Sequence, residues 1–160
     1  MNEQVERDVM EYDVLIIGGG PSGLSSAIKV KQLASAEGKD VSVCVLEKGS
    51  EIGAHILSGN VFEPTALNEL IPDWKEKEAP LNSPATKDIV KFMISENSSL
   101  NIPFPSFLIP TFNNHGNYVM SLANFTRWLA TQAESLGVEI FPGFTAAEVI
   151  FEENVVKGVL

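Results

Sequence analysis

The stretch Ile16–Gly23, IIGGGPSG, decides how the first part of this chain folds. Before it, residues 13–17 form a β-branched and nearly continuous apolar run, as in a strand buried on both faces of a parallel sheet. After it, apolar residues recur at helical intervals. A flexible linker lacks such neighbours, so the sequence predicts a strand, a glycine turn and a helix. The predicted buried face of the helix comprises Leu24, Ala27, Ile28 and Leu33.

Three glycines in this turn occupy the fixed positions of the pattern G-x-G-x-x-G. We expect Gly18 to allow the tight turn off the strand, Gly20 to let the backbone approach a pyrophosphate, and Gly23 to let the helix pack closely on the sheet. Pro21 suits the first helical turn, where N–H groups and the helix dipole favour an anion. Gly19 fills a position that the pattern leaves open. The candidate pyrophosphate contacts are Gly18, Gly20, Pro21, Ser22 and Gly23.

A second buried strand is predicted within VSVCVLEKG, residues 41–49, and it ends in Glu47. An acidic side chain at this place accepts hydrogen bonds from the ribose hydroxyls of an adenosine. The alternative is an ordinary solvated glutamate after a strand. A ribose acceptor implies an unmodified 2′-hydroxyl, so the pattern disfavours NADP and leaves both NAD and FAD open. Lys48 is a candidate neighbouring donor.

Composition excludes several classes of function. With 160 residues, of which 44% are hydrophobic and 20% charged, the chain is typical of a globular domain. The net charge of −10 argues against binding to nucleic acid. Cys44 is the one cysteine, so with two histidines a structural zinc site is not expected. No apolar run reaches the length of a membrane span, and the start resembles neither a signal nor a transit peptide.

A long excursion is expected after Glu47, in place of an immediate return to a helix and a third strand. The sequence predicts a loop, a short helix stopped by Pro72, a proline-rich connection, and a hairpin made from DIVKFMIS and LNIPF. The prolines and bulky apolar residues of IPFPSFLIPTFNNHGN, residues 102–117, exclude regular structure there.

Helical periodicity resumes near residue 122. This periodicity predicts a helix that ends at Gly137. The strand VEIF and a hairpin that turns at Glu152–Asn154 are predicted to follow it. This order is found in FAD-binding oxidoreductases of the glutathione-reductase and hydroxybenzoate-hydroxylase type. The predicted fold is therefore α/β, a Rossmann-like FAD-binding fold with an inserted substrate region and a β-meander. The face of the late helix comprises Leu122, Phe125, Leu129, Ala133 and Leu136.

Several segments resemble the amino-terminal part of the electron-transfer flavoprotein:ubiquinone oxidoreductase family. The likeness runs from about Tyr12 to the end of the chain, and its most specific parts are GAHILSG, PDWKEK with APLN, and NHGNY. One departure is Ser121, which stands where related flavoproteins often place an arginine, while Arg127 follows later in the helix.

The resemblance implies an enzyme that accepts electrons from a soluble electron-transfer flavoprotein. It implies transfer through FAD and a four-cysteine iron–sulfur cluster to ubiquinone at a membrane surface. Because the chain holds only Cys44, the 4Fe-4S cluster is expected in a C-terminal part that the chain lacks. We therefore expect an amino-terminal fragment, truncated at its C-terminus and inactive by itself. The expected organisation is a flexible start (1–11), a βαβ unit (12–52), an inserted quinone- and membrane-facing region (53–118), and an incomplete continuation of the FAD domain (119–160).

The resemblance also implies roles for individual residues. The glycine turn holds the FAD pyrophosphate, and Glu47 binds the adenosine ribose. His55, Ser58 and Gly59 are expected near the isoalloxazine ring and the quinone passage. The alternative for His55 is a loop histidine that bonds to the backbone. No general base is expected, because the flavin carries the electron-transfer chemistry.

Membrane attachment is expected through residues 53–74 without a span. An apolar stripe there either faces the membrane, as the resemblance implies, or packs on the protein's own core; residues 102–112 are a second candidate. The expected location is the cytoplasmic face of a bacterial inner membrane or the mitochondrial inner membrane. Rival functions are another nicotinamide- or FAD-dependent dehydrogenase and a non-catalytic binding module. The stripe comprises Leu67, Leu70, Ile71 and Trp74.

Overall fold

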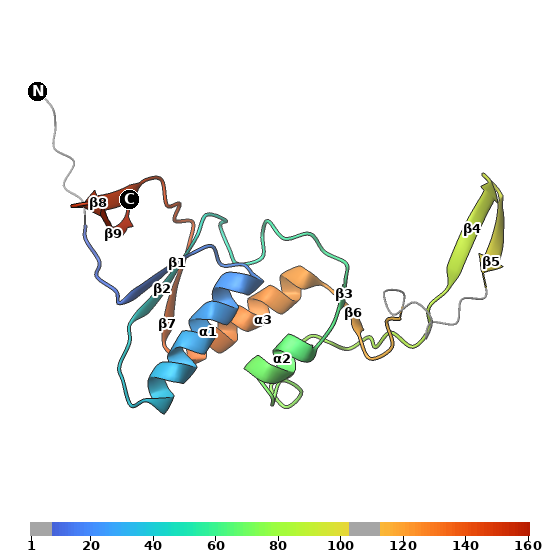
Figure 1. Ribbon diagram of the computed structural model, residues 1–160, viewed down its shortest axis with the longest axis horizontal. Coiled ribbons are helices and arrows are strands. Elements are labelled where there is room, and N and C mark those ends of the chain that lie inside the picture. The colour runs from blue at the N-terminus through green and yellow to red at the C-terminus, as the bar shows by residue number, and fades with distance from the viewer. Residues whose placement is uncertain (1–7, 103–112) are drawn as a thin grey trace, which may run out of the picture. The chain divides into compact units, whose positions relative to one another are not determined.

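The computed structural model describes residues 8–102 and 113–160 (Figure 1). The chain divides into two compact units. Unit 1 comprises Met1–His55 and Thr126–Leu160, and unit 2 comprises Ile56–Phe125.

Unit 1 contains the predicted strand, glycine turn, helix and second strand. Strand β1 (Val14–Ile17) leads into helix α1 (Pro21–Ala36), which is followed by β2 (Val43–Glu47). The later strand β7 (Val138–Pro142) completes a parallel sheet in the order β1-β2-β7 (Figure 1). Helix α1 contacts all three strands. This is the Rossmann-like α/β arrangement that the sequence predicts.

Burial in unit 1 corrects two expectations. Leu24 and Ile28 are buried as predicted, but Leu33 is 53% exposed. Leu33 lies half a helical turn away from Leu24 on the surface of α1, so Ala34 is buried in its place. Strand β1 is not buried on both faces, because its burial alternates and Ile17 is 54% exposed. Only the central strand β2 has consecutive buried residues, Val43, Cys44 and Val45.

A hairpin of β8 (Val149–Glu152) and β9 (Val155–Val159) ends the chain. Glu153 and Asn154 adopt positive φ angles of 49° and 65°, as a tight hairpin turn requires. The turn lies where the sequence predicts it. This antiparallel pair supplies two strands of the expected meander.

Unit 2 contains two antiparallel strand pairs and a short helix. Strand β3 (Asn60–Phe62) pairs with β6 (Tyr118–Met120), and helix α2 (Thr65–Leu70) follows β3. The expectation of a loop at residues 60–62 is wrong, because β3 is stabilised by a partner that lies far along the chain. The hairpin of β4 (Val90–Ser95) and β5 (Ser98–Ile102) confirms that a strand pair forms here. Strand β5 begins two residues before the predicted strand LNIPF, whose last two residues lie outside the described residues.

The apolar stripe of unit 2 lies in its own core. Leu67 is 3% exposed and Trp74 is 5% exposed, while Ile71 is also buried and lies beyond the end of α2. The Trp74 indole N–H donates a hydrogen bond of 2.7 Å to Asn68 Oδ1, and its ring packs edge-on against Tyr118. The expectation that this stripe faces a membrane is therefore wrong for its three buried members. Within residues 8–102 and 113–160, no helix has the length and apolar composition needed to cross a membrane.

Asp88, which precedes the β4–β5 hairpin in the sequence, is hydrogen-bonded to Asn114, which follows it. The Asp88 carboxylate accepts hydrogen bonds from the Asn114 backbone N–H (3.0 Å) and side-chain amide (2.7 Å). A tight turn begins here, since the Asn117 N–H donates to the Asn114 carbonyl and Gly116 has a φ of 90°. We call the Asp88–Asn114 contact the neck.

Helix α3 (Leu122–Ser135) runs from the end of unit 2 into unit 1. Its members Phe125, Leu129 and Ala133 are buried, as the periodicity predicts. Leu136 lies after the last helical residue and is exposed, which corrects its assignment to the buried face.

Candidate nucleotide-binding site

The glycine turn, residues 18–23, joins β1 to α1. Gly18 has a φ of 105°, a conformation that side chains rarely adopt, and its N–H donates a hydrogen bond of 2.8 Å to the Leu46 carbonyl. A Cβ atom on Gly23 would collide with the backbone carbonyl oxygen of Gly18. A Cβ atom on Gly20 would meet no atom of the chain within 4 Å. Gly23 therefore serves packing, whereas Gly20 leaves open space in front of the first turn of α1.

Gly19 is a site residue that the sequence pattern misses. It is buried, and a Cβ atom there would collide with Ile52 Cδ1. The pattern leaves its position open because the constraint comes from the loop after β2, which no local spacing rule describes. The loop packs directly against the glycine turn at this point.

Glu47 stands beside the glycine turn, at the carboxyl end of β2. Its Oε2 accepts a hydrogen bond of 2.9 Å from the Gly19 N–H, and its Oε1 accepts one of 2.7 Å from the Gly49 N–H. The carboxylate is partly buried and lies where the sequence places the ribose acceptor. The structure thus brings together the glycine turn and Glu47, which are separated in the sequence by the whole of α1.

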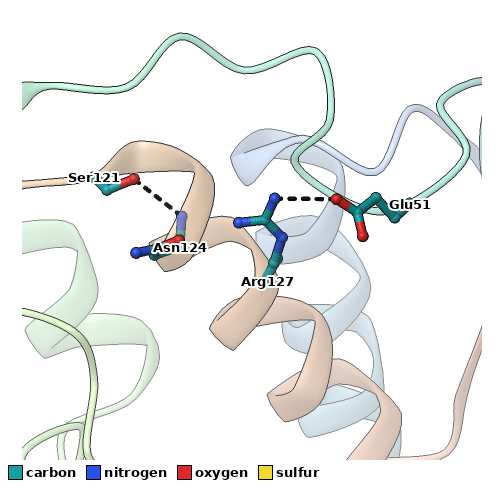
Figure 2. A network of polar contacts seen from close by, with 4 residues as sticks. All are labelled: Glu51, Ser121, Asn124 and Arg127. Carbon is teal, nitrogen blue, oxygen red and sulfur yellow. Dashed lines mark hydrogen bonds and ion pairs between the residues drawn. The ribbon is translucent and has the colours of Figure 1, made fainter.

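The loop after β2 is attached to the rest of unit 1 at further points. The Gly49 carbonyl accepts a hydrogen bond of 2.7 Å from the Gly143 N–H. Arg127 of α3 forms an ion pair of 3.2 Å with Glu51 (Figure 2). Both side chains of that pair are substantially exposed, so it contributes little free energy. Arg127 thus contacts the loop that carries Glu51.

Lys48 and His55, the remaining candidates in unit 1, are both exposed. The Nδ1 atom of His55 lies beside Gly49, at 3.4 Å from where a Cβ atom on that glycine would stand. Both residues therefore flank the segment that Glu47 holds.

Ser58 and Gly59 belong to unit 2. The Ser58 hydroxyl donates a hydrogen bond of 3.2 Å to Ser121 Oγ. Ser121 Oγ also accepts a hydrogen bond of 3.4 Å from the Asn124 N–H (Figure 2). Ser121 precedes α3 and caps its first turn. The position at which related flavoproteins often carry an arginine thus holds a capping serine.

Two side chains with shifted pKa values, Tyr12 and Cys44, lie outside the glycine turn. The Tyr12 hydroxyl donates a hydrogen bond of 2.8 Å to Glu139 Oε2, and this bond raises the pKa of Tyr12 to about 12. Burial raises the pKa of the Cys44 thiol in the central strand. In the described part of the chain, no three acidic, histidine or cysteine side chains gather as a metal site would require.

The fit of these residues to a dinucleotide is good. The open space beside Gly20 adjoins the first turn of α1, whose N–H groups favour an anion. A carboxylate stands beside the same turn. These are the contacts that an adenosine diphosphate group requires.

Comparisons with known proteins agree with this fold. The family described as NAD(P)-binding Rossmann-like domain matches residues 16–72. A geranylgeranyl bacteriochlorophyll reductase-like protein from Thermoplasma acidophilum is 25% identical with a TM-score of 0.65, over 92% of this chain and 34% of that one. The structure of CtdE in complex with FAD is 19% identical with a TM-score of 0.55, over 94% of this chain and 37% of that one, and shows likeness in fold alone.

Curated relatives are much more similar in sequence. The electron transfer flavoprotein-ubiquinone oxidoreductase of Pseudomonas aeruginosa is 57% identical over 98% of this chain and 28% of its own length. The mitochondrial protein of that name from Mus musculus is 49% identical over 97% of this chain and 25% of its own length. These relatives confirm the resemblance predicted from the sequence. Over almost its whole length, this chain is similar to about a quarter of an electron transfer flavoprotein-ubiquinone oxidoreductase.

Proposed function

We propose that this chain is the FAD-binding part of an oxidoreductase that takes electrons from reduced electron-transfer flavoprotein and passes them to ubiquinone. The observation that carries the proposal is the Glu47 carboxylate, hydrogen-bonded beside a glycine turn that leaves open space in front of α1. The relatives at 49–57% identity extend it from a dinucleotide site to this reaction.

The chain's own residues divide the binding of FAD between them. The glycine turn receives the pyrophosphate, where the dipole of α1 and the N–H groups of Pro21's neighbours stabilise negative charge. Glu47 accepts hydrogen bonds from the ribose hydroxyls, and Lys48 lies beside it as a donor. His55, Ser58 and Gly59 are proposed to face the flavin and quinone. Bound FAD supplies the electron-transfer chemistry.

The proposed organisation follows from these roles. Residues 12–52 and 119–160 form the FAD-binding domain, and residues 53–118 form an inserted region that serves the quinone. A 4Fe-4S cluster requires four cysteines, and this chain contributes none beyond the buried Cys44. We therefore assign the cluster to the part of the parent enzyme that the chain does not cover.

Membrane contact is assigned to the β4–β5 hairpin in preference to the buried stripe near α2. The hairpin exposes large apolar side chains on both strands, with Ile94 at 65% exposure. Exposed apolar side chains gathered on one short element favour a lipid surface. The second candidate, residues 102–112, lies almost wholly outside the described residues. The proposed location is the cytoplasmic face of a bacterial inner membrane or the inner mitochondrial membrane. The exposed side chains are Phe92, Met93, Ile94 and Leu100 of the hairpin and Ile89, which directly precedes β4.

A chimera tests the proposed function. In it, this chain replaces the matching quarter of the Pseudomonas aeruginosa relative. We expect the purified chimera to carry FAD in a ratio near one and to reduce ubiquinone with electrons from reduced electron-transfer flavoprotein. The relative itself is the positive control. A folded chimera that lacks flavin contradicts the proposal.

Two rivals give different results with the same protein. A nicotinamide-dependent dehydrogenase would bind NAD in titrations and would show no flavin spectrum. A non-catalytic module would bind neither nucleotide. The glycine turn and Glu47 suit NAD and FAD equally well. The nucleotide that the purified protein binds therefore distinguishes these two functions from the proposed one.

A further inference from the structure

The contacts of Glu47 suggest a role that precedes the binding of any nucleotide. Its two carboxylate oxygens accept hydrogen bonds from two different segments, the glycine turn through Gly19 and the loop after β2 through Gly49. Both donors are backbone N–H groups of the chain itself. The contacts therefore need no ligand to form, and they join the segment expected to hold phosphate to the segment expected to flank ribose.

Packing supports the same connection. Ile52 of the loop lies so close to the glycine turn that a Cβ atom on Gly19 would meet its terminal Cδ1 atom, and the Ile52 side chain would have to move to admit one. On its other side, the loop is held by the Gly143 N–H at the Gly49 carbonyl. The Phe144 N–H donates a hydrogen bond of 3.0 Å to the Glu47 carbonyl. The loop is thus fixed between the glycine turn and the end of β7.

Only glutamate satisfies this arrangement fully. A carboxylate offers about four lone-pair positions, and the two N–H groups use two of them. The remaining positions are available to hydroxyl groups. Glutamine has one acceptor oxygen and an amide that donates, so it can serve only one of the two N–H groups. Aspartate is one methylene shorter and cannot reach both segments in the same geometry.

We propose that Glu47 is a positioning residue that holds the glycine turn and the loop after β2 together, so that the binding site for an ADP group is formed in advance. The proposal rests on the proposed function for the identity of the nucleotide. It also predicts a ligand that the proposed function does not name, because a site formed in advance should bind free ADP as well as FAD. A 2′-phosphate would stand against the Glu47 carboxylate, so it should weaken the binding of an adenosine nucleotide that carries one.

Amide hydrogen exchange of the nucleotide-free chain, followed by NMR, tests the positioning role. We expect the Gly19 and Gly49 amides to exchange at least about a hundredfold slower than unstructured glycine. In Glu47→Gln, one of these two amides should exchange at least about tenfold faster, while those of Leu24 and Ile28 in α1 stay slow. Glu37→Gln, an exposed glutamate beyond the end of α1, is the matched control and should leave both amides protected. Unprotected Gly19 and Gly49 amides in the unaltered chain overturn the proposal whether or not the variant folds, and so do unchanged rates in a folded Glu47→Gln.

Titration with ADP separates this proposal from the proposed function. We expect the chain to bind ADP, with an affinity that falls at least about tenfold in Glu47→Gln and stays unchanged in Glu37→Gln. Adenosine 2′,5′-bisphosphate should bind at least about tenfold more weakly than adenosine 5′-monophosphate, from which it differs only by the 2′-phosphate. If the amides are protected and ADP binds but FAD does not, the proposed function fails while this proposal stands. If FAD binds but ADP does not, the site is not formed in advance and this proposal fails.

Discussion

Gly20 and Gly23 lack side chains for different physical reasons. At Gly23 the obstacle is the Gly18 carbonyl, a backbone atom that cannot rotate away. At Gly20 the chain offers no obstacle at all, and its backbone is extended with a φ of −78°. One position is therefore constrained by the fold, and the other by the proposed ligand.

This difference predicts opposite outcomes for two alanine substitutions. Gly23→Ala should destabilise the chain by about 1–3 kcal/mol, because the added methyl group overpacks the contact between turn and helix. Gly20→Ala should unfold like the unaltered chain but lower the affinity for FAD at least about tenfold. Thermal unfolding and flavin titration measure the two effects. Equal melting temperatures for both variants would contradict the steric assignment.

The neck residue Asp88 predicts a pH dependence. Hydrogen bonds from the Asn114 side-chain amide, and then from its backbone N–H, hold the pKa of Asp88 below its ordinary value of 3.8. A lowered pKa in the folded state stabilises the fold above the ordinary value, and this contribution is lost as pH falls through the lowered pKa. The stability lost in Asp88→Asn should therefore be constant between pH 7 and about pH 5 and should shrink below pH 3.8.

Urea unfolding of both proteins at several pH values measures this difference. Asp40→Asn, at an exposed aspartate in the loop between α1 and β2, is the matched control. If the difference in stability between Asp88→Asn and the unaltered chain does not change between pH 7 and pH 3, a stabilising role for the ionised Asp88 carboxylate is ruled out.

At the scale of elements, the β4–β5 hairpin makes the proposed membrane contact testable. Replacing Phe92, Met93 and Ile94 with serine in the chimera should abolish most of its binding to liposomes, because each buried apolar side chain contributes about 1.5–3 kcal/mol. Flavin content should not change, since none of the proposed FAD contacts lies on the hairpin. The same replacement at Val149, Phe151 and Val156 of the exposed β8–β9 hairpin is the control. Liposome binding that survives the first set and is lost with the second would move the contact to β8–β9.

Sequence reasoning succeeded where structure is local. The spacing around Ile16–Gly23 specifies β1, the glycine turn and α1 because strand, turn and helix signals lie within a few residues of one another. It failed at β3, whose three residues become a strand only through pairing with β6. The α2 stripe shows a second limit. Periodicity identified Leu67 and Trp74 as members of one apolar face, but it carries no information on whether protein or lipid covers that face.

The residues of the candidate site also fall into those that local sequence spacing predicts and those that it does not. Gly18, Gly20, Gly23 and Glu47 follow a known spacing and could be named in advance. Gly19 could not, because its constraint comes from Ile52, which approaches from another loop. The double use of the Glu47 carboxylate was equally hidden, since it depends on the path of the backbone at Gly49.

At the scale of the whole molecule, net charge opposes the association that exposed apolar side chains favour. The net charge is −10 and the isoelectric point is near 4.6. We expect the isolated chain to stay dispersed at neutral pH and low salt, and to become turbid near pH 4.6, where repulsion between molecules vanishes. Light scattering across the pH range measures this. Changing the exposed Lys29 and Lys39 to glutamate should move the turbidity maximum to lower pH, and a maximum that stays in place would show that charge does not control association.

The parallel pairing of β2 with β7 has a consequence for the order of folding. Val43 pairs with Val138, and the whole of unit 2 is encoded between them. During synthesis, β1, α1 and β2 can therefore meet long before their third strand exists. The entropy lost in closing so long a loop grows only slowly with its length, but pairings distant in sequence form slowly. Until β7 arrives, the outer edge of β2 is unpaired and able to capture a strand from another chain. The interval before β7 docks is thus one in which the nascent protein is exposed to misfolding, and in which a chaperone can protect it.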